Sequence, residues 1–418
     1  MPVDDLWYLS KRGPDGERVP SKRCGRGKRW RVRFTDDLGA PKQLLFEKKA
    51  DADRYDAGAR TDVARGQYID PKAGKQTLRD YALSWLKAQT FDPSTRTAVE
   101  LRLRCHVYPV LGNHELRVLA QRPSLVQAWV RGLQGGLAPN YVRTVFANLS
   151  TVLNAAMDDG LIARNPCRAK SVKPPAPDRS KVQPWTVERV EAVKGGLPKR
   201  YASTVDAGSG LGLRQGEVFG LSPDDVDWLR RIVHVRRQVK YLAGKLVFAP
   251  PKGGKERDVP LSDCVSLGLA AHLKEFPAVA VTLPWQEPDG KLITVQLMFT
   301  GRERTAINKN YFNSHLWKPA LVAAGVIGDR DPGEHYEESR EHGFHALRHF
   351  YASVLLADGV DIRALAEYLG HADPGFTLRT YCHLMPEAED KARRAVDRAL
   401  CQAPVDGSLV PRLFRAGA

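Results

Sequence analysis

Closely spaced prolines in one stretch of this 418-residue chain limit its fold more than any other feature. The stretch RNPCRAKSVKPPAPDRSKVQP, residues 164–184, contains five prolines and six basic residues. Proline lacks a backbone donor and interrupts helices and central strands, so this stretch is unsuited to regular structure. We therefore predict a linker at residues 166–185 between two folded parts. We expect Lys170 and Lys173 within it to reach along a charged ligand.

The part before the linker, residues 76–165, has the apolar spacing of helices. The segment TLRDYALSWLKAQ opens with a capping pattern formed by Thr77 and Asp80. Three further helical stretches follow: DPSTRTAVELRLRCHVYPVLG, SLVQAWVRGLQGG and APNYVRTVFANLSTVLNAAMDDG. Together they predict a small all-α domain.

Residues 1–70 contain a strongly basic strand pattern. In RVPSKRCGRGKRWRVR, eight of sixteen residues are basic and none is acidic. The alternation in RWRVRF places Arg29, Arg31 and Arg33 on one face of a strand. The run KQLLFEK can supply a partner strand, and ADADRYDAGARTDVARG a short helix. We predict a small sheet whose arginine face, with Lys28 beside it, contacts DNA; a solvated basic strand is the alternative.

The charge of the whole chain favours a polyanionic partner. Lys and Arg total 64 against 48 for Asp and Glu, a net charge of +16. Nucleic acid is the leading candidate, because phosphates neutralised by protein release their counterions. The six cysteines form no CxxC pair, which indicates neither a zinc module nor a disulfide framework. Because no signal peptide or membrane-length apolar run is present, we expect a cytoplasmic protein.

The third part, residues 186–402, mixes helices with short strands such as RIVHVRRQVKY and precedes a tail at 403–418. In GSGLGLRQGEVFGLSPDD, Arg214 follows a glycine-rich turn and Glu217 comes about one helical turn later. A guanidinium held by that carboxylate can still offer its fork to a phosphate. An ordinary ion pair within a helix is the alternative.

A lysine-bearing hairpin is predicted next. The segment KLVFAPPKGGKERDVPLS indicates a strand, a Gly253–Gly254 turn and a second strand, with Lys252 and Lys255 at the tip. A flexible ammonium there could protonate a leaving oxygen. Hairpin tips are commonly rich in lysine, so a purely structural turn is the alternative.

Basic and phenolic residues gather in two consecutive segments near residue 360. GFHALRHFYASVLLADG places His345, Arg348 and His349 on one helical face. DGVDIRALAEYLGHADPGFTLRTYCHL then predicts a helix that stops at a glycine, with His371 in the following turn and Tyr381 on the next helix. The combination favours phosphate chemistry.

These motifs, taken in order, resemble those of the tyrosine recombinases, the phage integrase family. They are GLGLRQGE, the lysine hairpin ending in VPL, HALRH, LGH, and a tyrosine followed by HL. The layout is similar to that of three-part integrases of actinobacterial phages and mobile elements. The resemblance implies a multidomain fold with a small β-sheet plus helix N-terminal arm-binding domain, an all-α (SAM-like) core-binding domain and a mixed α+β catalytic domain.

The resemblance also implies a site-specific recombinase that integrates or excises a phage genome or mobile element. Tyr381 would attack the scissile phosphate and form a 3′-phosphotyrosyl link. Arg214 and Arg348 would clamp the non-bridging oxygens, and His371 would donate a further hydrogen bond to them.

The remaining roles follow from the same resemblance. Lys252, preferred over Lys255 for its place at the start of the turn, would be the general acid for the 5′ oxygen. His345 would be the general base or hydrogen-bond partner at the tyrosine, and Glu217 would hold Arg214. His349 is expected to be packed or hydrogen-bonded nearby, outside the catalytic set.

The partners implied are double-stranded DNA at attachment sites and three further copies of the chain, giving a homotetramer on DNA. An excision factor and a host DNA-bending protein could assist in the nucleoid of a bacterial host. No cofactor is expected, because the phosphotyrosyl bond conserves the energy of the phosphodiester. The segment that ends in residues 403–418 would pack on an adjacent subunit.

Three other readings compete with this one. His345 and His349 have a spacing that suits zinc, but the sequence offers no clear third ligand. The segment ASVLLADGVDIRALAEYLGHADPGFTLRTY also has the pattern of a helix-turn-helix, which would make a non-catalytic DNA-binding protein. A type IB topoisomerase would share the chemistry and relax one DNA molecule.

Overall fold

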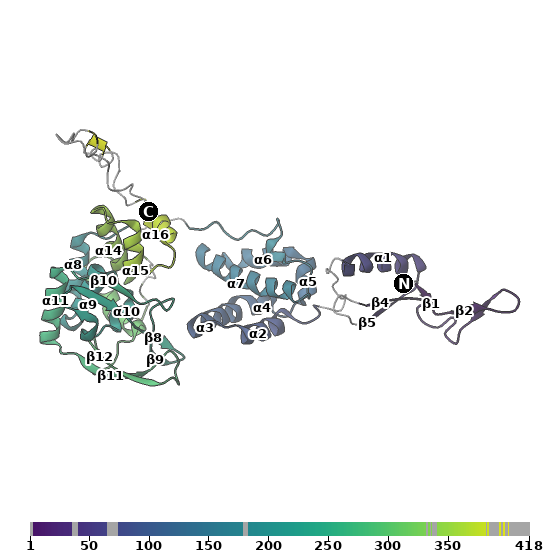
Figure 1. Ribbon diagram of the computed structural model, residues 1–418, viewed down its shortest axis with the longest axis horizontal. Helices are drawn as coiled ribbons and strands as arrows, with labels where there is room; N and C mark the ends of the chain where they lie inside the picture. Colours follow the sequence, from purple (N-terminus) through teal and green to yellow (C-terminus); the bar gives the residue numbers. More distant parts are fainter. Residues whose placement is uncertain are drawn as a thin grey trace, which may run out of the picture. The chain divides into compact units, whose positions relative to one another are not determined.

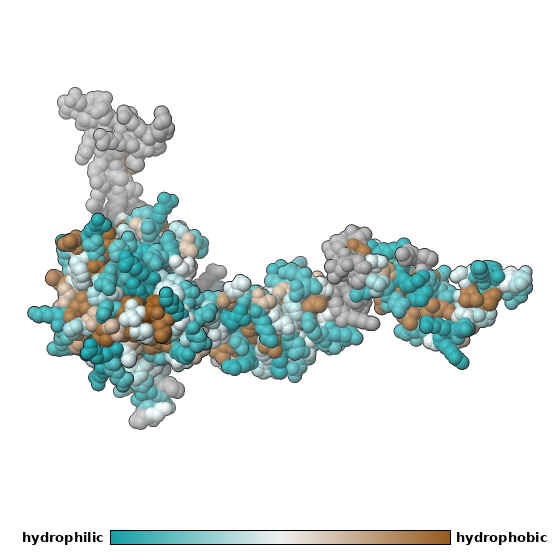
Figure 2. All heavy atoms as spheres, turned by 60° about the horizontal axis from the view of Figure 1, so that its bottom comes forward, coloured by the Kyte–Doolittle hydropathy of each residue, from teal (hydrophilic) through white to brown (hydrophobic). Residues whose placement is uncertain are grey.

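The computed structural model describes residues 3–35, 41–64, 74–178, 183–331, 333–334, 336, 341–381, 383, 393, 396–397 and 400. The chain divides into two compact units, residues 1–179 and 180–418 (Figure 1). Hydrophilic side chains cover most of the face of each unit drawn in Figure 2. Among the described residues, no helix combines the length and the apolar character that a membrane crossing requires. The tail predicted at 403–418 lies outside the described residues.

The first unit begins with a three-stranded antiparallel sheet in the order β1-β4-β5. The central strand β4, Trp30–Thr35, pairs with β5, Pro41–Phe46, as the alternation in the sequence predicts. Helix α1, Lys49–Ala64, packs on the face where Val32 is buried. The sequence did not predict β1, Asp4–Asp5, or the two-stranded sheet of β2, Tyr8–Arg12, and β3, Arg18–Pro20.

The helical part of this unit confirms the predicted helix starts. Thr77 accepts the amide hydrogen of Asp80 at the start of α2, and Asp92 accepts that of Ser94 at the start of α3. The second predicted helix continues through a π-helical turn, which the sequence does not signal. The elements are α2 (Leu78–Ala88), α3 (Pro93–Arg102), η1 (Leu103–Val107), α4 (Tyr108–Leu111), α5 (Leu116–Gln121), α6 (Pro123–Leu133), α7 (Pro139–Asp158) and η2 (Pro166–Arg168).

The first half of the predicted linker packs against these helices. Cys167 and Val172 belong to the buried core of the helical part, and Lys173 donates its amide hydrogen to Gln127. Beyond η2 the prolines leave the backbone without helix or strand up to Asp178. Apolar side chains between the prolines therefore anchor a segment that the composition alone assigns to a linker. Lys170 and Lys173 are both exposed.

The second unit surrounds one large apolar core with helices and short strands. Helix α14, His345–Ala357, lies close against α9, Lys199–Leu211. The approach depends on Gly208, because a Cβ there would come within 2.8 Å of Leu347. The other helices are α8 (Val187–Gly196), α10 (Gln215–Phe219), η3 (Pro223–Asp225), α11 (Asp263–Glu275), α12 (Lys309–Phe312), η4 (Asn313–Trp317), α13 (Lys318–Ala323), α15 (Ile362–Leu369) and α16 (Pro374–Tyr381).

The strands of the second unit correct one prediction. Strand β9, Lys245–Ala249, pairs with β8, Gln238–Leu242, whereas β10, Arg257–Pro260, pairs with β7, Ile232–Val235. The predicted hairpin of β9 and β10 is therefore wrong: the lysine turn joins two different sheets. Pro250 and Pro251 end β9 before it can pair with β10. The remaining strands are β6 (Val226–Asp227), β11 (Val279–Pro284) and β12 (Leu292–Leu297).

Candidate active site

A buried carboxylate lies at the base of the predicted site. Glu217, on α10, is 1% exposed and accepts hydrogen bonds from two arginines. Arg214 donates from its backbone amide and its Nη1, both at 2.9 Å. Arg257, on β10, donates from Nη1 at 3.1 Å and Nη2 at 2.7 Å. Burial alone would raise the pKa of Glu217, but the hydrogen bonds and charge of Arg257, with the charge of Arg214, lower it to about 2.

Arg257 also holds Glu217, a contact that the sequence did not predict. Its side chain is almost fully buried, and its Nε donates to the carbonyl of Tyr368 at 2.7 Å. The residue therefore links Glu217 to the last turn of α15. Arg257 begins β10, the strand that follows the lysine turn, and this position was the only signal in the sequence. The sequence does not show that β10 pairs with β7, where Arg257 lies opposite Val235.

The two predicted phosphate clamps meet at the end of α15. Half-buried Arg214 donates from Nη2 to the carbonyl of Gly370 at 3.3 Å. Arg348, on α14, is 1% exposed and donates to the carbonyls of Leu369 and Gly212. Burial, and then the charge of Arg214, lowers the pKa of Arg348 to about 9. Its buried Nε has no hydrogen-bond partner among the described residues.

His371 lies beside Arg348 in the turn between α15 and α16. Nη2 of Arg348 is 2.9 Å from Nε2 of His371, and Nδ1 of His371 is 2.7 Å from Oγ1 of Thr377. A guanidinium can only donate, so Nε2 accepts and the ring proton is on Nδ1. Burial, followed by the charge of Arg348, lowers the pKa of His371 to about 4. In this arrangement His371 is neutral and has no hydrogen on Nε2 to donate.

The predicted nucleophile is buried against a histidine of α14. Tyr381, the last residue of α16, is 1% exposed, and its Oη is 2.7 Å from Nδ1 of His349. Burial raises the pKa of Tyr381 to about 12, although the charge of Arg348 acts in the opposite direction. His345 is exposed one turn earlier, and its ring packs edge-on against that of His349 with centroids 4.8 Å apart.

The phenol contact singles out His349, which was predicted to be packed or hydrogen-bonded nearby. Its position four residues after His345 placed both histidines on the same face of α14. The sequence could not show which of the two histidines reaches Tyr381, because that depends on how α16 crosses α14. Among the described residues, no group of three His, Cys, Asp or Glu side chains could hold a metal ion around this pair.

Lys252 makes no contact with the other predicted site residues in the part of the chain that the structure describes. It is exposed in the turn after β9, and within the described parts of the chain no hydrogen bond or ion pair joins it to Arg214, Arg348 or Tyr381. Gly253 and Gly254 both have positive φ angles there, +82° and +70°, which suit glycine. Lys255 is exposed in the same turn, so the structure does not distinguish the two lysines.

The arginines of the N-terminal sheet have acidic partners. Arg31 and Arg33 both pair with Asp4, with N to O distances of 3.0 and 2.9 Å, and Arg29 pairs with Asp5 at 2.8 Å. The hydrogen bond from Arg29 lowers the pKa of Asp5. The predicted arginine face therefore exists but is partly neutralised from strand β1. Lys28, beside it, is exposed.

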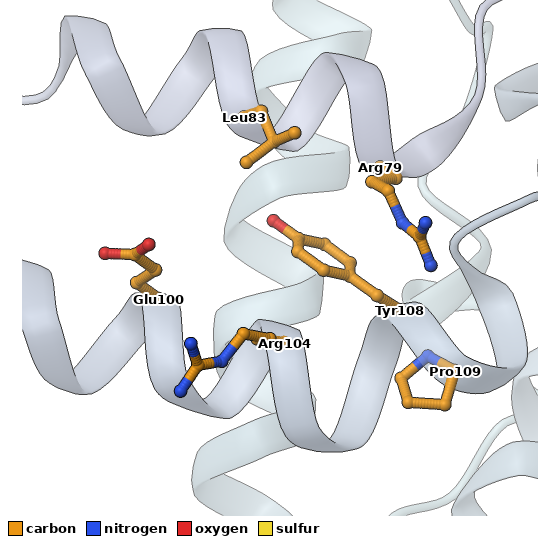
Figure 3. A pocket seen from close by; sticks show the side chains of 6 residues that line it. All are labelled: Arg79, Leu83, Glu100, Arg104, Tyr108 and Pro109. Carbon is orange, nitrogen blue, oxygen red and sulfur yellow. The ribbon is translucent and has the colours of Figure 1, made fainter.

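A separate cavity lies in the helical part of the first unit. It has a volume of about 370 Å³ and lies between α2 and the α3–α4 segment (Figure 3). Arg79 lies over the ring of Tyr108, 5.7 Å from its centroid. The buried hydroxyl of Tyr108 has no hydrogen-bond partner among the described residues. None of the predicted site residues lines this cavity.

Comparison with known proteins gives consistent matches. Residues 191–388 match the model of the phage integrase family. The chain is 26% identical over 357 residues to the integrase of Mycobacterium phage L5, covering 83% of this chain and 87% of that protein. It is 25% identical over 361 residues to the putative prophage phiRv2 integrase of Mycobacterium tuberculosis, covering 84% and 88%.

Solved structures share the fold. The Tn1549 transposon integrase, in complex with a circular intermediate DNA, matches with a TM-score of 0.62 at 19% identity, covering 77% of this chain and 99% of that chain. The lambda integrase tetramer bound to a Holliday junction matches with a TM-score of 0.53 at 12% identity, covering 85% and 92%. At these identities the likeness concerns the fold alone.

Proposed function

Because this chain belongs to the phage integrase family of tyrosine recombinases, we propose that it cuts and rejoins DNA through a 3′-phosphotyrosyl intermediate on Tyr381. The chain is a site-specific DNA recombinase that acts in integration. One observation supports its residue assignments most directly. Arg214 and Arg348, far apart in sequence, both donate to the turn that ends α15, and this turn leads directly into the helix of Tyr381.

The arginines would bind the scissile phosphate. Glu217 and Arg257 hold Arg214 in a fixed direction, so its guanidinium does not need to reorganise when charge builds on phosphorus. Arg348 is fixed by two backbone carbonyls and has a free Nε. Fixed cations of this kind stabilise the additional negative charge of a phosphoryl transition state.

The transfer itself exchanges one oxygen on phosphorus for another. Oη of Tyr381 loses its proton and bonds to phosphorus, and the bond from phosphorus to the 5′ oxygen breaks. Lys252, on a turn with two positive-φ glycines, gives the departing 5′ oxygen its proton. The reverse step rejoins the strand with a 5′-hydroxyl from the other DNA site. Because one phosphodiester-like bond replaces another, the step needs no external energy source.

Several partners belong to the proposal. The lambda integrase that shares this fold was solved as a tetramer on a Holliday junction, which supports a homotetramer on two attachment sites here. The N-terminal arginine face, with Lys28, would bind a second, arm-type DNA sequence, and Lys170 and Lys173 would lie along the phosphate backbone. We propose an excision factor and a host DNA-bending protein, both in the bacterial nucleoid, as further partners.

The test is capture of the covalent intermediate. The protein is incubated with a nicked duplex that carries the attachment sequence from the ends of its mobile element, and protein–DNA complexes that survive detergent are measured. We expect them with the native chain and with Tyr351→Phe, a buried tyrosine control on α14, and not with Tyr381→Phe. A covalent complex with Tyr381→Phe would contradict the assignment.

A second assay separates recombination from topoisomerase activity. Two attachment sites on separate DNA molecules are offered together with a supercoiled plasmid that has no site. A recombinase joins the two sites, whereas a type IB topoisomerase relaxes the plasmid without exchange. A helix-turn-helix protein without catalysis would bind DNA and do neither.

A further inference from the structure

The hydrogen bond between His349 and Tyr381 determines where the phenolic proton lies before reaction. Burial, and then the charge of Arg348, lowers the pKa of His349 to about 4, so its imidazole is neutral near pH 7. Tyr381 has a raised pKa and keeps its proton. The phenol therefore donates to Nδ1, 2.7 Å away, and the ring hydrogen of His349 is on Nε2.

His345 occupies a different position relative to the phenol. It is exposed, and among the described residues no hydrogen bond joins it to Tyr381. Its ring contacts the ring of His349 edge-on. An exposed imidazole at the start of α14 can meet an incoming phosphate. The half-buried ring of His349 instead accepts the hydrogen bond from the phenol, whose proton must leave during attack.

We propose that His349, and not His345, accepts the proton of Tyr381 when the phenol attacks DNA. This inference rests on the proposed function, with Tyr381 as nucleophile. The Oη–H bond breaks as the Oη–P bond forms, and the proton moves to Nδ1, which gives an imidazolium. In the reverse step the same imidazolium returns the proton to the departing phenolic oxygen. His345 is left as a hydrogen-bond donor to the phosphate.

The charges around His349 make this transfer depend on bound DNA. On its own helix, Arg348 and His345 face it; the turn after α15 contributes His371, and α16 contributes Tyr381. The negative charge of Glu217 is already balanced by Arg214 and Arg257. A scissile phosphate adds negative charge to this cationic site, which raises the proton affinity of His349.

Three forms of the full-length chain test the proposal on the nicked attachment duplex. His349→Asn keeps a hydrogen-bond acceptor close to the position of Nδ1 but has no group basic enough to take the proton. His349→Ala removes both the acceptor and the base. We expect covalent complexes to form about 10²–10⁴-fold more slowly in each, as for loss of a general base. His345→Asn is the matched control, because it leaves His349 in place. A more acidic phenol at position 381 should therefore change its cleavage rate by the same factor as in the native chain.

A change in the nucleophile distinguishes proton transfer from packing. In each background Tyr381 is replaced by difluorotyrosine, whose phenol ionises near neutral pH and needs no base. We expect this replacement to restore most of the rate lost in His349→Asn and His349→Ala. DNA binding and thermal melting are measured for every variant. If His349→Ala does not fold, the conservative Asn variant provides the comparison.

Two results would overturn the proposal: native-like cleavage by either His349 variant, or a slow folded variant that difluorotyrosine does not restore. Restoration of His345→Asn alone would assign the base to His345. Failure of the proposed function has a different signature, because the native chain would then give no covalent complex, or Tyr381→Phe would give one.

Discussion

Arg257 and Glu217 form a two-pronged ion pair whose side chains are 1% and 0% exposed, and Glu217 is shared with Arg214. One carboxylate thus fixes two guanidinium groups. In the proposed function Arg214 is the cation that binds substrate, whereas Arg257 balances the charge of Glu217. Arg257 can therefore be replaced without removing a side chain that is proposed to touch DNA.

Loss of Arg257 is expected to destabilise the second unit strongly. Arg257→Met leaves a buried carboxylate with one partner, and breaking such a pair costs about 3–5 kcal/mol. Arg257→Lys keeps the charge but loses the fork, so we expect an intermediate loss. Chemical denaturation of the full-length chain measures both. Arg231→Met removes an exposed pair with Asp263 and should change little; equal effects of the two Met variants would contradict the role of Arg257.

The pH dependence of stability should carry a contribution from Glu217. Its pKa is lowered from 4.5 to about 2 in the folded chain, so its stabilising contribution is complete above pH 4.5 and is lost as the pH falls towards 2. A shift of this size corresponds to about 3 kcal/mol. The difference in unfolding free energy between the native chain and Glu217→Gln should therefore shrink over that range. A constant difference would show that the charge of Glu217 does not stabilise the fold.

Lys252 and Lys255 can be separated by the chemistry of the leaving group. We expect Lys252→Ala to slow cleavage of the normal attachment duplex by about 10²–10⁴-fold, as for a lost general acid. A scissile phosphate with sulfur in place of the bridging 5′ oxygen needs no acid, so the variant should cleave it at nearly the native rate. Lys255→Ala is the matched control in the same turn. The reverse pattern would assign the acid to Lys255.

The acidic partners of the N-terminal sheet should weaken its binding to DNA. Arg31→Ala removes one proposed phosphate contact, so affinity for the arm sequence should fall and the slope of log affinity against log salt should decrease by about 1. Asp4→Asn frees Arg31 and Arg33 from their shared carboxylate, so affinity should rise at low salt. Salt titrations by fluorescence anisotropy measure both. Unchanged binding by Arg31→Ala would favour a merely solvated strand.

The sequence predicted local structure better than pairing. The helix starts at Thr77 and Asp92 were correct because a capping side chain acts within three residues. The β9–β10 hairpin was wrong because the partners of a strand depend on distant segments: β10 pairs with β7 across the whole β8–β9 pair.

The same limit applies to the site. Ordered motifs pointed to Arg214, Arg348 and His371, which the structure gathers around the end of α15. They also pointed to Tyr381, whose hydroxyl contacts His349 on α14. The pairing of Arg257 with Glu217 and the contact of His349 with the phenol could not be predicted from the sequence. Burial and the crossing of helices decide which side chains meet. The acids of β1 were missed for a similar reason: two residues at the start of the chain pair with a strand more than twenty positions later.

The carbonyls of Leu369 and Gly370 are adjacent in the chain, and each accepts a hydrogen bond from one of the two arginines that we propose to bind phosphate. These hydrogen bonds give both guanidinium groups a defined direction without substrate. A bound phosphate would compete with the end of α15 for the same donors. Its affinity would then report the difference between two sets of acceptors, and not the full strength of either set.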